Sequence, residues 1–302
     1  KSVKQQLALR VLSTAALMAM VSSIATAAFA DTYDLNKGSV DILAEGGKQY
    51  ITQWEDKDND TCVKDGEGKE IRDREDSDIT LTTKNETTDK TETTDKTETT
   101  DKTKPTSNTV TIDAKEGNTA NVTLQDVHIE VNTSDAKSGA IEIKGDGNTN
   151  LELNGDNTVL VENDWHDDHA AIEKADKYGT GTLTIKDDLN DDDDCTPKDK
   201  DENGNAVGGD TGKLVAGGYY NGAGIGGGSY HYEEKKDYAD TSNITITGGE
   251  ITASGGYYGA GIGAGCYGDA SNIRIEGNAH VTAFSDGSAA IGSGYQSNGN
   301  SD

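Results

Sequence analysis

The sequence predicts an all-β protein folded as a parallel β-helix, in which one winding backbone stacks its coils on one another. The first reason is a period of about 30 residues near the C-terminus, which indicates a repeat architecture. The second is that a strand-like phrase alternates with a glycine-rich phrase. The glycine-rich copies read GGYYNGAGIGGG at 217–228, GGYYGAGIGAG at 255–265 and, more weakly, SDGSAAIGSG at 285–294, and the strand-like copies read SNITITGGEITAS at 242–254 and SNIRIEGNAHVTAF at 271–284.

The isoleucines favour this stack over an antiparallel sandwich, the other fold that evenly spaced short strands allow. In a parallel stack, equivalent residues of successive coils lie about 4.8 Å apart, so like residues cover like. We therefore expect the repeated isoleucines to form an internal ladder, with glycines at the corners where positive φ is needed. Its expected members are Ile244 and Ile246 under Ile273 and Ile275, and Ile225 under Ile262 and Ile291.

The first thirty residues have the pattern of a secretory signal peptide. A basic start is followed by a long apolar run that ends at Ala28-Phe29-Ala30, a small-x-small pattern for cleavage before Asp31. An uncleaved membrane anchor is the alternative, because the run is long enough to span a bilayer. We expect a secreted or cell-surface protein whose mature part, residues 31–302, is one β-helix domain without a membrane span. The chain stops within a loop phrase, which leaves open a continuation to an anchor.

Three stretches are expected to loop out of the β-helix. Two are acidic, at about 54–78 and 188–212, and the third, at about 84–107, is of low complexity. The third holds three copies of ETTDKT without an apolar residue to offset the entropy of ordering, so we expect a disordered excursion. No segment has a helical period. Strand phrases fill 33–53, 79–83, 108–113, 121–131, 139–145, 150–163, 169–174 and 181–187.

Charge and cysteine content limit the function classes. The chain has 27 Lys and Arg against 55 Asp and Glu, a net charge of −28, which excludes nucleic acid as a partner because phosphates would be repelled. Solvation of a secreted protein is the plain explanation of this acidity, and binding of a divalent cation is the sharper one. The three cysteines, Cys62, Cys195 and Cys266, cannot all pair within one chain, and a Cys62–Cys195 bridge stays open.

The order of the phrases resembles a known family. YDLNKGSVDI, NTVTID, NVTLQDVHIEV, NLELNGDNTVL, AAIEK and GTLTIKD, followed by repeated GAGIGGG and NITITGGEITAS, look like the secreted carbohydrate-binding β-helix proteins of gut and cellulolytic Firmicutes. The resemblance covers most of 33–295, without the acidic stretches and the ETTDKT tract. It implies right-handed winding, a secreted or surface location, and binding of plant or host polysaccharide, in some members acidic pectic chains with calcium nearby.

Paired tyrosines are the predicted ligand-binding residues. Tyr219-Tyr220 and Tyr257-Tyr258 occupy the same place in successive copies, so stacked coils would align them into an aromatic strip. Aromatic faces bind the apolar C–H face of sugar rings. The alternative is an aromatic ladder that only covers a corner of the β-helix. The predicted site consists of Tyr219, Tyr220, Asn221, Tyr230, Tyr257 and Tyr258, with His231 as a further polar neighbour.

The stretch 199–210 matches the start of a calcium-binding loop, D-x-[DN]-x-[DN]-G, and has an Asp at the twelfth position. Alternate oxygens can wrap a hard cation there, while Gly204 permits the sharp turn. A weaker echo at 56–67 has Thr61 in place of the glycine. A solvated acidic loop is the alternative for both. The predicted Ca²⁺ ligands are Asp199, Asp201, Asn203, Asn205 and Asp210, and the echo would use Asp56, Asp58, Asp60 and Glu67.

Two further motifs are interpreted as structural. His166-Asp167-Asp168-His169 has a spacing that would suit a transition metal, but a turn between two coils accounts for it. GAGIGGG lacks the Lys and the following helix of a phosphate-binding loop.

Together these observations favour a non-catalytic polysaccharide-binding or adhesin-like protein, secreted or on the cell surface. One rival is a structural surface protein that binds a protein partner and no sugar. The other is a polysaccharide-degrading enzyme resembling pectate lyase, which would need a base to abstract a proton and calcium to acidify that proton. Arg274 is the one arginine on a repeat strand, and no local motif marks the paired carboxylates of a hydrolase.

Overall fold

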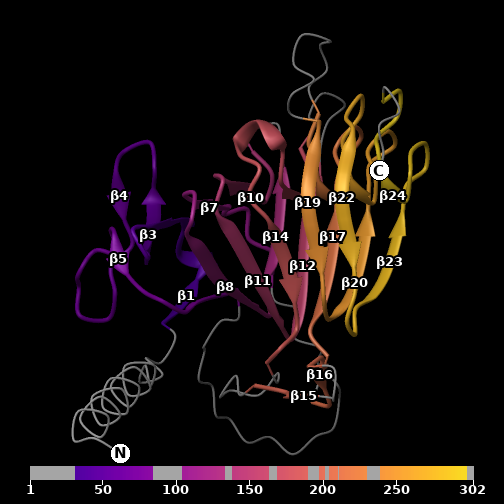
Figure 1. Cartoon of the computed structure of the whole chain (residues 1–302). Coiled ribbons are helices and arrows are strands. Elements are labelled where there is room, and N and C mark those ends of the chain that lie inside the picture. The colour runs from indigo at the N-terminus through magenta and orange to yellow at the C-terminus, as the bar shows by residue number, and fades with distance from the viewer. Residues whose placement is uncertain are drawn as a thin grey trace, which may run out of the picture. The chain divides into compact units, whose positions relative to one another are not determined.

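The protein is described from a computed structural model (Figure 1). The chain divides into two units, residues 1–30 and 31–302, and the fold below is that of the second unit. The predicted signal peptide and the ETTDKT tract lie outside the described part of the chain. Among the described residues, no helix is long and apolar enough to cross a membrane. The structure describes residues 31–83, 104–132, 138–162, 169–189, 197–200, 204–209, 211–229 and 239–297.

Three sheets of parallel strands make up most of the described chain, which passes through them in a fixed order (Figure 1). One coil is one passage through the first, second and third sheet. The first sheet contains β7 (Val110–Ala114), β10 (Ile141–Lys144), β13 (Ile172–Glu173), β18 (Ile225–Gly226), β21 (Ile262–Gly263) and β24 (Ile291–Gly292). The second contains β1 (Thr32–Asp34), β6 (Ile79–Thr82), β8 (Thr119–Gln125), β11 (Asn148–Asn154), β14 (Leu183–Lys186), β19 (Thr241–Ile246) and β22 (Ala270–Ile275). The third contains β9 (His128–Asn132), β12 (Asp156–Glu162), β17 (Lys213–Gly217), β20 (Glu250–Ser254) and β23 (His280–Phe284).

The predicted isoleucine ladder is confirmed. In the first sheet Ile225 pairs with Ile262, which pairs in turn with Ile291. In the second sheet Ile244 and Ile246 of β19 pair with Ile273 and Ile275 of β22. In strands such as β7 and β14 buried apolar side chains alternate with half-buried polar ones, because successive side chains of a strand point to opposite faces. The parallel stack is therefore the correct choice over the antiparallel sandwich.

The N-terminal end of the first sheet departs from the parallel pattern. Strand β2 (Ser39–Glu45) pairs with β7 in parallel, but on its other side it pairs antiparallel with β3 (Lys48–Asp56). The two are joined by Gly46-Gly47, both at positive φ, as a tight hairpin requires. Strand β3 in turn pairs antiparallel with β4 (Thr61–Cys62) and β5 (Arg74–Glu75). The acidic stretch expected to loop out at 54–78 thus supplies strands that cover this end of the sheet.

The second acidic stretch contains a short antiparallel ribbon of β15 (Asp199–Lys200) and β16 (Ala206–Val207). The only helical elements in the described chain are two 3₁₀ turns, η1 (Leu35–Lys37) and η2 (Asp176–Tyr178). Cys62 and Cys266 are both buried, and Cys62 is a free thiol, so the bridge from Cys62 that the sequence left open is not formed. Cys195 lies outside the described residues.

Candidate functional site

Four tyrosines, Tyr220, Tyr257, Tyr258 and Tyr295, pack into one group that we call the tyrosine cluster. Tyr258 lies at its centre. The ring centroid of Tyr258 is 5.5 Å from that of Tyr220 and 4.6 Å from that of Tyr257, both edge to face. The ring of Tyr295 lies 4.7 Å from Tyr258 at an interplanar angle of 40°. These are the separations at which aromatic pairs attract one another.

The stacked backbone places these rings above one another. The N–H of Tyr258 donates to the carbonyl of Tyr220 at 2.7 Å, and the N–H of Tyr295 donates to the carbonyl of Tyr258 at 3.0 Å. Tyr220 has a φ of 41°, a left-handed conformation that is costly for a side chain of this size. Gly256 lies so close to the backbone of Tyr219 and Tyr220 that a Cβ at this position would overlap it. The repeated glycine is therefore needed for the rings to stack.

The cluster offers open aromatic surface. Tyr257 is 53% exposed and Tyr295 is 40% exposed. Loss of water around the phenol, followed by the neighbouring tyrosines, raises the pKa of Tyr258. The neutral phenol hydroxyls of the cluster both donate and accept hydrogen bonds.

The predicted site residues are only partly brought together. The cluster includes Tyr220, Tyr257 and Tyr258, whereas Tyr219 packs against the hydrophobic core. Asn221 is buried, so it does not lie on the open surface as the sequence suggested. Tyr230 and His231 lie outside the described residues. Tyr295 was missed. The paired tyrosines precede the isoleucine in the first two glycine-rich copies, whereas Tyr295 follows the isoleucine in the third, and only the stacked backbone brings it to Tyr258.

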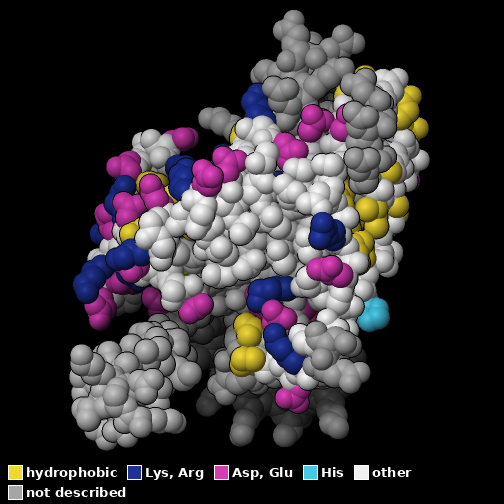
Figure 2. Space-filling model, viewed as in Figure 1, with side chains coloured by type: hydrophobic (Ala, Val, Ile, Leu, Met, Phe, Trp, Pro, Cys, Tyr) yellow, Lys and Arg dark blue, Asp and Glu magenta, His cyan; other side chains and the backbone are white. Residues whose placement is uncertain are grey.

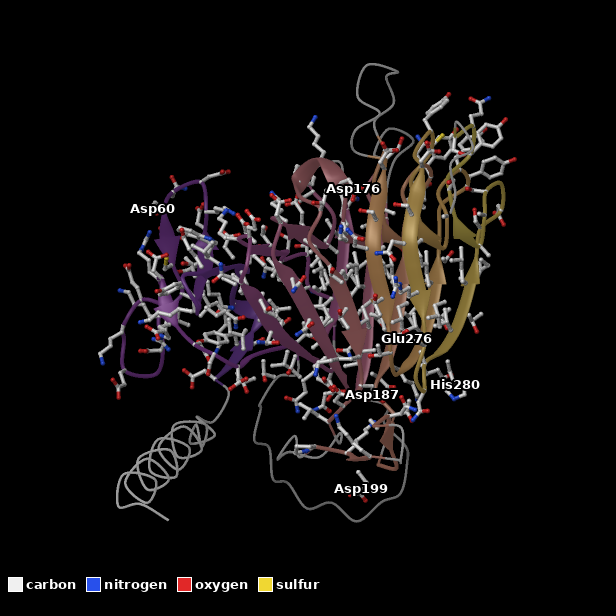
Figure 3. The ribbon with its side chains drawn as sticks, in the orientation of Figure 1. Asp60, Asp176, Asp187, Asp199, Glu276 and His280 are labelled. Atoms are coloured by element: carbon white, nitrogen blue, oxygen red, sulfur yellow. The ribbon has the colours of Figure 1, made fainter. Side chains whose placement is uncertain are left out.

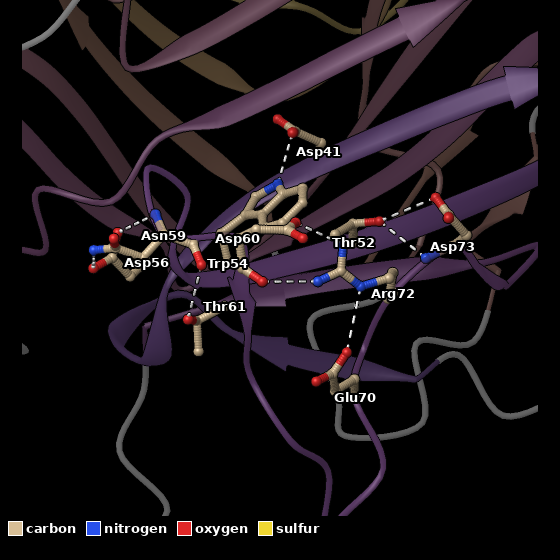
Figure 4. A network of polar contacts seen from close by, with 10 residues as sticks. All are labelled: Asp41, Thr52, Trp54, Asp56, Asn59, Asp60, Thr61, Glu70, Arg72 and Asp73. Carbon is tan, nitrogen blue, oxygen red and sulfur yellow. Dashed lines mark hydrogen bonds and ion pairs between the residues drawn. The ribbon is translucent and has the colours of Figure 1, made fainter.

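The weaker calcium motif at 56–67 is folded in another way (Figure 4). Both carboxylate oxygens of Asp56 accept hydrogen bonds from Asn59. Asp60 pairs with the guanidinium of Arg72 at 2.8 Å, and Glu67 pairs with Lys69. No group of three or more metal-ligating side chains occurs among the described residues. Of the stronger motif, the described residues include Asp199, exposed on β15, and Asn205, while Asp201, Asn203 and Asp210 lie outside them.

A groove of about 1130 Å³ lies over the first sheet, beside the antiparallel strands. Its aromatic lining is Tyr50, Trp54 and Tyr178. The indole N–H of Trp54 donates to Oδ2 of Asp41 at 2.7 Å (Figure 4). The Arg72 guanidinium lies 5.2 Å from the Trp54 ring centroid, and the ammonium of Lys144 lies 4.9 Å from that of Tyr178. Because cations of the same chain cover these two rings, the groove offers less free aromatic surface than the tyrosine cluster.

Two carboxylates also lie side by side on the first sheet, where Glu142 of β10 pairs in register with Glu173 of β13. Lys144 lies 2.8 Å from Glu142, and Nδ1 of His169 lies 2.6 Å from Glu173. Their side chains are 5% and 1% exposed. Burial raises the pKa of Glu142. Both carboxylates are held by basic partners and shielded from solvent, so this pair does not present the open acid and base that hydrolysis of a polymer needs.

Comparison with known proteins agrees with the fold. The model of a family described as Beta helix repeat matches residues 244–266 and 273–295. These two segments hold β19 to β21 and β22 to β24, so each match spans one strand of every sheet. No curated protein and no solved structure matches the chain. The described chain is thus built largely of parallel sheets and contains two β-helix repeats near its C-terminal end.

Proposed function

We propose that this chain is a non-catalytic polysaccharide-binding protein, secreted or displayed on a cell surface, and that the tyrosine cluster holds the sugar chain. The observation that carries the proposal is the row of rings from Tyr220 through Tyr258 to Tyr295, with Tyr257 beside it. The rings of Tyr220, Tyr258 and Tyr295 come from successive turns of the backbone, whose main chains are hydrogen-bonded to one another at these residues. Such a surface is rigid before the ligand arrives, which lowers the entropy cost of binding.

The chemistry of the cluster suits a carbohydrate. Sugar rings have an apolar C–H face that stacks on aromatic rings, and hydroxyls that need polar neighbours. The phenol hydroxyls supply both donors and acceptors. The net charge of −28 would repel an acidic glycan, so a neutral glycan is favoured unless a divalent cation bridges the two.

We further propose that such a cation is Ca²⁺ bound at 199–210, through Asp199, Asp201, Asn203, Asn205 and Asp210. The alternation of oxygen ligands and the glycine at the turn support this proposal. Calcium titration of the protein followed by calorimetry tests it directly. Unchanged heats in the variant Asp199→Asn would count against this loop as the binding site.

The winding is proposed to be right-handed, as crossovers between parallel strands of one sheet are in almost all proteins. An experimental structure decides the hand.

A glycan array tests the proposed function. We expect the protein to bind at least one polysaccharide class, and the variant Tyr257→Ala/Tyr295→Ala to lose that signal. Val215→Ala is the matched control, because Val215 is also exposed and lies on β17, outside the tyrosine cluster. If binding survives the double tyrosine substitution, the tyrosine cluster is not the sugar-binding site. If the protein binds no glycan at all, a structural surface protein is favoured.

A further inference from the structure

The groove over the first sheet has a floor made of two rows of side chains that cross four strands. Because β3, β2, β7 and β10 are neighbours in the sheet, side chains in register lie in line, about 4.8 Å apart from strand to strand. All eight residues of the two rows line the groove, whose floor is therefore about 14 Å long across the strands. One row holds Thr52, Asp41, Thr111 and Glu142, and the other holds Tyr50, Leu43, Asp113 and Lys144.

The size of the groove suits an extended chain. Its volume of about 1130 Å³ exceeds the range of about 300–1,000 Å³ that is usual for small-molecule pockets. An extended peptide rises about 3.3 Å per residue, so about four residues cross the floor. Thr109 and Thr111 are half-buried in the lining, and their hydroxyls can donate to and accept from a peptide backbone.

The lining of the groove carries an excess of negative charge. It contains five carboxylates and two lysines, a formal net charge of −3. Figure 2 shows Asp and Glu side chains gathered, together with Lys and Arg, over the antiparallel strands at the N-terminal end of the sheet. The charged residues of the lining are Asp41, Asp58, Asp73, Asp113, Glu142, Lys57 and Lys144. A cationic ligand is therefore favoured in the groove.

Two of the carboxylates are open to such a ligand. Asp41, Asp113 and Glu142 are each held by a lysine of the same chain. In the part of the chain that the structure describes, no basic side chain forms an ion pair with Asp58 or Asp73, and both aspartates are exposed. Oδ1 of Asp73 lies 3.4 Å from the hydroxyl of Thr52, which places it at the β3 end of the first row (Figure 4).

Other classes of ligand fit this groove less well. Arg72 and Lys144 already cover the rings of Trp54 and Tyr178, so little aromatic surface is left for a sugar. An acidic ligand would be repelled by the lining. A metal ion lacks a site among the described residues, which contain no group of three or more metal-ligating side chains.

The second row favours lysine as the source of the cation. It begins with Tyr50 and Leu43, which together form an apolar surface beside the open carboxylates of the β3 end. The methylene stem of a lysine can lie on such a surface while its ammonium group reaches a carboxylate.

We propose that the groove binds an extended, lysine-rich segment of a partner protein. The segment crosses the strands over the two rows, its ammonium groups bind Asp58 and Asp73, and its methylene stems lie on Tyr50 and Leu43. The groove shares no residue with the tyrosine cluster, so this is a second function at a separate surface. It also gives a role to the acidic stretch 54–78, which contains both open aspartates.

Calorimetric titration of the purified chain with hexalysine, at low salt and without glycan, tests the proposal. We expect saturable binding that Asp58→Asn/Asp73→Asn weakens about 5- to 30-fold, the effect of losing two exposed ion pairs. Asparagine keeps the shape of the side chain and tolerates the left-handed φ of 46° at position 73. An unchanged far-UV circular dichroism spectrum verifies that the variant is folded.

The matched control is Glu116→Gln/Glu250→Gln, which removes the same charge at two exposed residues outside the groove. This control is needed because a chain with a net charge of −28 attracts any polycation. It should bind hexalysine as the wild type does. Equal losses in the two double variants would overturn the proposal, because the attraction would then come from the overall charge. No binding of hexalysine would overturn it as well.

Two further measurements identify the occupant and its place. Spermidine, a small polyamine, should bind more weakly than hexalysine, because it has no peptide backbone to contact the threonines. Equal affinities would overturn a peptide segment as the occupant. Hexalysine should protect Tyr50 from nitration and leave Tyr257 and Tyr295 reactive. Protection of Tyr257 and Tyr295 in place of Tyr50 would also overturn the proposal, whatever the outcome of the glycan array.

Discussion

Ile291 lies directly over Ile262 in the first sheet, yet Ile262 is fully buried and Ile291 is 44% exposed. The two residues occupy equivalent positions in successive coils and differ in what covers them. Burial in this fold is therefore supplied by the next coil and not by the coil itself, as expected of a repeat protein.

The stability contribution of one isoleucine should thus depend on its coil. We expect Ile246→Ala to cost about 2–5 kcal/mol of unfolding free energy, as for other fully buried isoleucines. The stacked equivalent, Ile275→Ala, should cost about 1 kcal/mol or less, since much of its surface already contacts water. Urea denaturation of both variants, at a concentration where the chain is monomeric, measures the difference. Equal losses would mean that the C-terminal coil is covered in solution.

Gly256 is expected to be required for the tyrosine cluster. A Cβ at this position would overlap the backbone of Tyr219 and Tyr220, and that backbone cannot move without breaking the stack. We expect Gly256→Ala to cost about 2 kcal/mol or more and to weaken glycan binding together with stability. Gly66→Ala is the control, because no atom lies within 4 Å of a Cβ placed there and its φ is ordinary. Equal changes in melting temperature for Gly256→Ala and Gly66→Ala would refute this role of Gly256.

Lys174 should give the protein a pH-dependent stability. Its side chain is buried, and Nζ lies 3.6 Å from Oδ1 of Asp176, too far for a hydrogen bond. Burial lowers the pKa of Lys174, so between that lowered pKa and the ordinary value of about 10.4 the unfolded chain binds more protons than the folded one. Stability contributed by this group therefore rises with pH in this window.

Lys174→Met should remove this rise and leave the protein as stable or more stable at neutral pH, because a buried charge with a distant partner is replaced by an apolar chain of similar length. Asp176 keeps a partner in the variant, the hydroxyl of Ser242 at 2.8 Å. Unfolding free energies of both proteins from pH 7 upwards provide the measurement. Parallel pH profiles for the two proteins would show that Lys174 is not the group responsible.

A buried ion pair anchors the start of the second acidic stretch. Nζ of Lys198 donates to both carboxylate oxygens of Asp187 at 2.7 Å, and both side chains are buried (Figure 3 labels Asp187 and the neighbouring Asp199). Removing Lys198 takes the ion-pair partner away from a buried carboxylate, so Lys198→Met should cost about 3–5 kcal/mol. Asp187→Leu/Lys198→Met should recover most of that loss. A double-mutant cycle with no coupling would contradict this description of the pair.

The repeated part of the chain could be predicted from sequence because its coils are alike. Ile225, Ile262 and Ile291 are followed by the same glycine, and parallel stacking in register is the arrangement that places like on like. The antiparallel N-terminal end is not repeated, so no comparison between copies was available there. Its hairpin signal, Gly46-Gly47, lies inside an alternating stretch that parallel and antiparallel strands share.

The candidate site could be predicted only in part, for a physical reason. Tyr257 and Tyr258 were found because they repeat an earlier pair, but sequence does not say which of two adjacent side chains turns outward. Tyr219 packs against the core, whereas Tyr220, which has a left-handed φ, joins the cluster. Tyr295 contacts Tyr258, but the two residues occupy different positions in their copies. Aligning the copies with one another therefore does not reveal this contact.

Tyrosine nitration with peptide mapping tests the central claim most directly. The exposed rings of the free protein, Tyr257 and Tyr295, should react readily. With a saturating amount of the polysaccharide found by the array, both should be protected, while Tyr50 in the groove should react as before. Protection of Tyr50 with unchanged reaction at Tyr257 and Tyr295 would contradict the account, because it would place the sugar in the groove and not on the tyrosine cluster.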